Sequence, residues 1–127
     1  LKYLNEWNEK RRRNAEIYNY LLREIMTIHE IPRENKSVFH IYAIRHKKRD
    51  KLREFLQNRG ISTGVHYEKP IHLQKAYSFL NHKELDFPVA EKVTREILSL
   101  PMYPELTEEQ IGYVCDAIKE FIMLNKI

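Results

Sequence analysis

The chain has a single cysteine and no apolar run long enough to cross a bilayer as a helix. Because Cys115 has no second cysteine to pair with, the sequence excludes an internal disulfide framework and favours a reducing, cytoplasmic setting. Cys115 falls on the apolar stripe of a predicted helix, so its expected role is packing in the core. The sequence also contains no internal repeat and no low-complexity segment. We therefore expect no membrane partner.

A methionine start and a signal peptide are also missing. The chain opens at Leu1 and passes directly into an amphipathic pattern, as a piece cut from a longer protein does. Its 127 residues, 43% of them hydrophobic, are enough to bury one core. The expected organisation is one domain over residues 1–127, with any further domain lying outside this sequence.

Basic residues are in excess, with a formal net charge of +4, and they gather in two runs, at 11–13 and 45–49. Such runs raise the hypothesis of a nucleic-acid-binding protein. Three consecutive residues of a helix, however, point around most of a turn, and Glu6, Glu9 and Glu16 flank the first run. The second run joins a predicted strand to a predicted helix. Both runs are typical of solvated surface, so nucleic acid is not expected as a partner.

Hydrophobic periodicity alternates between helical and strand spacing along the chain. Residues 38–45 are apolar on both faces, as a central strand is, and His40 shares a face with Ile44 as an expected core histidine. Thr107 to Gln110 has the residues of a capping box and predicts the start of the last helix. The predicted elements are helices near 4–25, 50–59, 73–80, 88–96 and 107–121, and strands near 37–45, 61–67 and 97–100. The order α-β-α-β-α-α-β-α predicts an α+β fold, with a small, mainly antiparallel sheet covered by helices.

The densest run of polar side chains lies between Gly60 and Tyr77. Before it, the apolar spacing of residues 52–56 predicts a helix that stops at Gly60 in a left-handed conformation. Within it, Pro70 removes a backbone donor and ends the strand predicted over 61–67. The run therefore occupies a strand end and its exit loop, where binding residues are commonly carried. The candidate substrate-binding residues are His66, Tyr67, Lys69, His72 and Gln74.

Other chemical roles for this run have less support in the sequence. Lys69 follows a glutamate in a polar loop that offers nothing to desolvate an amine, so a Schiff-base role is not expected. The spacing of His66, His72 and His82 does not fit a helical pair of metal ligands, and no metal is expected. Structural roles for His66 and His72, and packing of Tyr67 under the loop, stay open as alternatives.

Four segments of the chain resemble the C-terminal small domain of the DegT/DnrJ/StrS family of pyridoxal-phosphate-dependent nucleotide-sugar aminotransferases. They are residues 6–22, 38–45, 49–77 and 87–114, and HYEKPIHLQ and ILSLPMYPELTEEQ are their most specific blocks. The family often has a proline directly after its His-Tyr pair, whereas Glu68 and Lys69 stand here before Pro70. That departure concerns the loop on the sugar side rather than the fold.

The resemblance implies that the enzyme's functions are divided between two domains. In the family, a large N-terminal domain, absent from this chain, holds pyridoxal phosphate (PLP) through a lysine, and the enzymes are homodimers with active sites at the subunit interface. The implied reaction transfers an amino group, usually from glutamate, to a nucleotide-linked keto-sugar in polysaccharide or antibiotic sugar biosynthesis. The chain then has no catalytic residue, binds no cofactor, is inactive alone and forms one wall of the sugar site. The alternatives are a DNA-binding regulator that uses the basic runs and a self-standing interaction domain.

Overall fold

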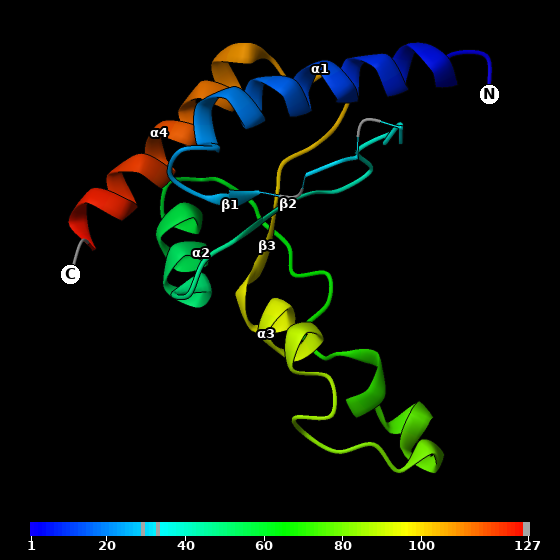
Figure 1. The fold of residues 1–127 in the computed structure, drawn as a ribbon. Helices are drawn as coiled ribbons and strands as arrows, with labels where there is room; N and C mark the ends of the chain where they lie inside the picture. The colour runs from blue at the N-terminus through cyan, green and yellow to red at the C-terminus, as the bar shows by residue number, and fades with distance from the viewer. Residues whose placement is uncertain (29, 33, 126–127) are drawn as a thin grey trace.

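The computed structural model describes residues 1–28, 30–32 and 34–125. These residues form a small antiparallel sheet with helices around it, so the predicted α+β class is confirmed (Figure 1). The elements are α1 (Leu4–Leu22), β1 (Thr27–Ile28), β2 (Tyr42–Arg45), α2 (Arg49–Gln57), η1 (Ile71–Leu73), η2 (Lys75–Leu80), α3 (Pro88–Glu96), β3 (Ile97–Leu100) and α4 (Glu108–Leu124). Within the described ranges, no helix is both long enough and apolar enough to cross a membrane.

The sheet has the order β1-β2-β3. Ile44 lies at its centre, opposite Ile28 on one side and Leu98 on the other, and its side chain is fully buried. Strand β2 is shorter than predicted, since the positive φ of 47° at Phe39 interrupts the extended backbone before Tyr42. The sequence does not predict β1 at all, because two residues are too few to show a periodicity.

The strand predicted over residues 61–67 is wrong, because only Gly64 pairs with the sheet, in a single antiparallel bridge to Ser99. The Gly64 N–H donates to the Ser99 carbonyl over 3.0 Å, and the Ser99 N–H donates back over 2.8 Å. In this register the next hydrogen-bonded partner along the chain after Ser99 is Pro101, which has no N–H to donate. The ladder therefore cannot continue in that direction.

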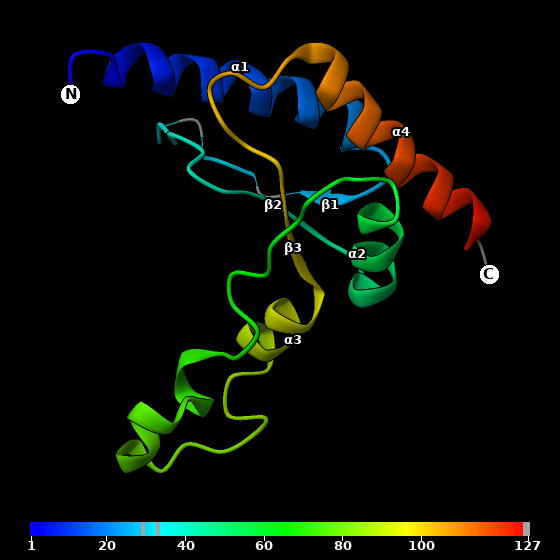
Figure 2. The same cartoon turned by 180° about the vertical axis from the view of Figure 1, so that it is seen from behind.

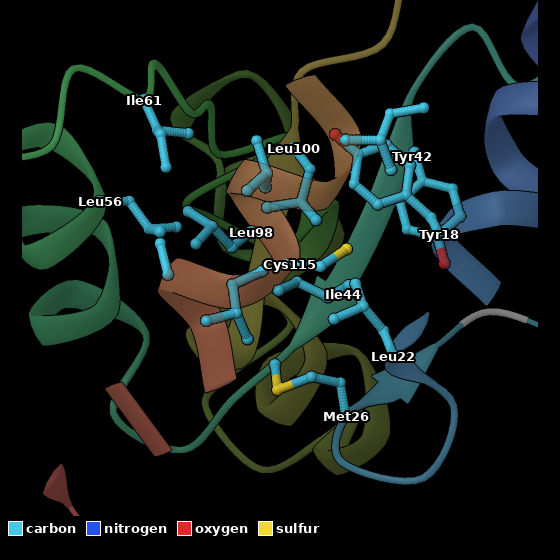
Figure 3. Packing of buried hydrophobic residues seen from close by; sticks show 14 of the residues in the cluster. Tyr18, Leu22, Met26, Tyr42, Ile44, Leu56, Ile61, Leu98, Leu100 and Cys115 are labelled. Atoms are coloured by element: carbon cyan, nitrogen blue, oxygen red, sulfur yellow. The ribbon is translucent and has the colours of Figure 1, made fainter. Parts of the chain in front are cut away.

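The core lies between the sheet and the helices α1, α2 and α4 (Figure 3). Tyr18 of α1 stacks on Tyr42 of β2 with 4.7 Å between ring centroids. Each buried hydroxyl has a partner: Tyr18 donates to the Pro101 carbonyl over 3.0 Å, and Tyr42 donates to Asn19 Oδ1 over 2.7 Å. Burial raises the pKa of both phenols, so both stay protonated donors.

Helix α4 follows its prediction closely. Thr107 Oγ1 accepts from the Gln110 N–H while the Gln110 side chain accepts from the Thr107 N–H, which completes the predicted capping box. Cys115 is fully buried on the inner face of the helix, as expected of a core residue. Burial raises the pKa of its thiol to about 12, so the thiolate is not populated at neutral pH.

Residues 66–87, here called the arm, extend away from the sheet and past α3, as both ribbon views show (Figures 1 and 2). The arm contains η1 and η2 and leads into α3, whose first residue, Pro88, is the predicted one. In residues 62–97, all of which the structure describes, no hydrophobic side chain is buried. The arm therefore has no apolar core of its own.

Candidate functional site

A hollow of about 520 Å³ opens where the segment around Gly64 crosses the end of β3. It is called the His66 hollow below. Its lining combines three segments that are far apart in the sequence: the residues just before β2, the segment 62–67, and the end of β3 with the residues that follow it. The residues that matter to its chemistry are His40, Gly64, His66, Tyr67, Ser99 and Met102. Two of the five predicted binding residues, His66 and Tyr67, are among them.

His66 is held in place by the strand that it crosses. Its Nδ1 lies 2.9 Å from Ser99 Oγ, and a Cβ atom at Gly64 would come within 2.7 Å of its Cε1. The imidazole ring therefore lies directly over Gly64, where any other residue would displace it. Tyr67 follows with its ring 5.6 Å from that of His66 and with 70% of its surface exposed. Together they present an imidazole and a phenol at the rim of the hollow.

His40 is exposed and lines the His66 hollow, so the expectation of a core histidine is wrong. The prediction failed because it extended the alternation of β2 back to residue 37, whereas the strand begins only at Tyr42. Without that strand, His40 is free to turn away from the core. The one sequence signal that could have identified it is a histidine placed just before a strand, the position typical of binding residues.

The other predicted residues lie in the arm, outside this lining. Lys69 is exposed, and its carbonyl oxygen accepts from Gln74 Nε2 over a long 3.4 Å. The Nε2 atom of His72 lies 3.1 Å from Glu91 Oε1, and the His72 and Glu91 side chains are only 8% and 3% exposed. The structure thus divides the predicted residues into a pair in the hollow, a pair in the loop beside it, and one buried histidine.

The lysines that the structure describes are exposed or partly exposed. A Schiff-base lysine needs a desolvated amine, but no lysine in the described part of the chain is buried. Nor do the described residues gather three histidine, cysteine or carboxylate side chains that could hold a metal ion. The polar groups of the hollow can hydrogen-bond to a ligand, while the Ser99 hydroxyl beside His66 belongs to a residue that is only 5% exposed.

Comparison with known proteins identifies the family. The model of the DegT/DnrJ/EryC1/StrS aminotransferase family matches residues 1–119. The chain belongs to this family. A solved member, DesV of Streptomyces venezuelae in complex with a ketimine intermediate, superimposes with a TM-score of 0.91 at 35% identity, over 95% of this chain and 33% of that one.

Two relatives within the DegT/DnrJ/EryC1/StrS family carry names of different kinds. A "pleiotropic regulatory protein" of Geobacillus stearothermophilus is 46% identical over 94% of this chain and 33% of its own length. The dTDP-3-amino-3,4,6-trideoxy-alpha-D-glucose transaminase of Streptomyces venezuelae is 36% identical over 95% of this chain and 32% of its own. The chain thus spans about a third of the length of these relatives.

Proposed function

We propose that this chain is the C-terminal small domain of an aminotransferase that moves an amino group, with glutamate as donor, to a nucleotide-linked keto-sugar. The observation that carries the proposal is the His66 hollow, a hydrogen-bonding surface on a chain that superimposes on DesV in its complex with a ketimine intermediate at a TM-score of 0.91. We place the protein in the cytoplasm, where such activated sugars are made.

In this proposal the hollow forms one wall of the sugar site. His66, fixed by Ser99, and the exposed Tyr67 hydrogen-bond to sugar hydroxyls or phosphate oxygens. His40, in the lining of the same hollow, does the same. Lys69 and Gln74, in the loop beside the hollow, add a positive charge and an amide for the nucleotide phosphates.

The amino transfer itself lies outside this chain. PLP supplies the electron sink for transamination, and the protein around it supplies orientation and electrostatics. Since the described lysines of this chain are not buried, we assign the cofactor to a separate large domain. We further propose that this domain and the second subunit of a homodimer are the chain's protein partners.

Exposed apolar side chains support a protein partner. On α1, Leu4 and Trp7 are exposed, whereas Tyr18 is fully buried against Tyr42. The arm exposes a second and larger set: Ile71, Tyr77, Phe79, Leu80, Leu85 and Phe87. Apolar groups in such number on a domain surface are typical of an interface.

The proposal is tested by adding PLP to the 127-residue chain and to the product of the complete gene that encodes it. We expect no imine absorbance and no borohydride-fixed adduct with the chain alone, since no described lysine is desolvated. The complete product should show both, and should aminate a dTDP- or UDP-linked keto-sugar with glutamate. A stoichiometric adduct on one lysine of the 127-residue chain, or a complete product with no transaminase activity, would contradict the proposal.

A second candidate function, a DNA-binding regulator, is favoured by the name of the Geobacillus stearothermophilus relative. The basic runs give it little support, because several of their charges are already paired. Arg13 contacts Glu108, and Arg45 Nη2 lies 2.7 Å from Glu96 Oε2. Ion pairs of this kind reduce the charge available to phosphates.

We therefore expect the chain to bind mixed-sequence duplex DNA no more tightly than the ~10⁻⁴ to 10⁻⁶ M of non-specific contacts at physiological salt. A fluorescence-anisotropy titration at two salt concentrations measures this. A sequence-dependent affinity about a thousandfold tighter would establish the regulator function instead.

A further inference from the structure

Glu91 is the only carboxylate among the buried residues of segment 62–97, all of which the structure describes. It lies in the first turn of α3 and is 3% exposed. A carboxylate is removed from water at a high cost in free energy unless hydrogen bonds replace its hydration. Burial of Glu91 therefore calls for several donors around it.

The hydrogen-bond donors to Glu91 come from two parts of the arm, η1 and the loop before α3. Glu91 Oε1 accepts from the Leu85 N–H over 2.8 Å and from the Phe87 N–H over 3.4 Å. The same oxygen lies 3.1 Å from His72 Nε2. Because a carboxylate oxygen can only accept hydrogen bonds, His72 must carry a proton on Nε2 and donate it to Glu91. One carboxylate thus joins η1, the loop before α3 and α3 itself.

Aromatic rings close around this junction. The centroid of the Phe87 ring lies 4.8 Å from that of the His72 ring and 5.0 Å from that of the His82 ring. His82 Nδ1 in turn lies 3.2 Å from Asp86 Oδ2. Since no hydrophobic side chain of the arm is buried, hydrogen bonds and ring contacts such as these are the interactions available to fix its chain path.

We propose that Glu91 is a positioning residue, which holds the segment 66–74 in place through His72 and through the N–H groups of Leu85 and Phe87. His72 then acts on the ligand indirectly, through the path of the arm, and not by touching the ligand. The identity of the ligand, a nucleotide-linked keto-sugar, rests on the proposed function. The position of the segment is measurable without any substrate.

The test compares Glu91→Ala, Glu91→Gln and a control, Glu84→Ala, in the 127-residue chain. Glu84 is an exposed carboxylate of the same loop. Loss of the charged acceptor should speed hydrogen exchange at the Leu85 and Phe87 amides by roughly ten- to a hundredfold in Glu91→Ala. Tryptic cleavage after Lys75 and after Lys83, both in the arm, should accelerate to a similar degree.

A further readout and a conservative variant separate a positioning role of Glu91 from a role in packing alone. Imidazole ¹⁵N shifts should report the Nε2–H tautomer of neutral His72 in the parent chain and a mixture of tautomers in Glu91→Ala. Glu91→Gln keeps a carbonyl oxygen, so it should retain the tautomer and restore most of the amide protection. The inference is overturned if Glu91→Ala leaves exchange, cleavage and tautomer unchanged, if Glu91→Gln behaves like Glu91→Ala, or if Glu84→Ala has the same effect. An inactive complete enzyme would contradict the proposed function but would not alter any of these readouts.

Discussion

Replacing Ile118 by alanine is expected to lower the free energy of unfolding by about 3 kcal/mol, within the ~2 to 5 kcal/mol typical of large-to-small changes in a core. Ile118 is fully buried on the inner face of α4, so truncation leaves a cavity in the core as well as losing apolar contact. Domains of this size have a total stability of about 5–15 kcal/mol, so the effect is large. Urea denaturation followed by circular dichroism measures it.

The matched control is Leu124→Ala, on the same helix but with 68% of the side chain exposed. Its cost should stay within about 0.5 kcal/mol, as for surface substitutions generally. Equal effects of the two changes would mean that α4 does not bury the face assigned to it.

The second large effect is expected at His66 in the complete enzyme. Replacing His66 by alanine removes a hydrogen-bonding group from the proposed sugar wall and should cost roughly 1–3 kcal/mol of transition-state binding. That corresponds to a fall of about tenfold to a hundredfold in kcat/KM for the nucleotide sugar. The half-reaction with the amino donor should change much less, because that donor is small and reacts close to the cofactor. Single-turnover kinetics of the two half-reactions separate the effects.

Gly64→Ala provides an independent version of the same experiment. It leaves His66 in the chain but places a methyl group where its ring lies, 2.7 Å from Cε1. A shift of the ring away from Ser99 should therefore reproduce part of the His66→Ala defect. If both variants lose only thermal stability, with unchanged kinetics per folded molecule, His66 is a structural group and the sugar wall lies elsewhere.

The helices were largely predictable because their signals are local. The capping box at Thr107, Pro88 at the first position of α3 and the left-handed Gly60 after α2 all act through the nearest turn of backbone. Strand limits depend instead on which partner is available. Residues 61–67 have a strand-like pattern, but a proline at position 101 of the neighbouring segment limits them to one bridge. Periodicity within one segment contains no information on such a partner.

The site was predictable as a segment but not as a set of contacts. The sequence grouped His66 with His72 because they are close in the chain. The structure instead pairs His66 with Ser99, and His72 with Glu91, through hydrogen bonds that span 33 and 19 residues. It also brings His40 to the hollow, from a segment assigned to the core. Contacts of this length follow from the topology of the sheet, which a single sequence does not specify in advance.

The bridge between Gly64 and Ser99 has a consequence for the behaviour of the domain in solution. It occupies the outer side of β3, where free N–H and C=O groups would otherwise offer a template to a strand of another molecule. At the opposite side of the sheet, β1 is only two residues long, which is too short to template such a strand. Polymerisation through intermolecular β-pairing is thus opposed at both edges of the sheet. The segment around Gly64 covers β3 at one edge, and β1 is too short to pair at the other.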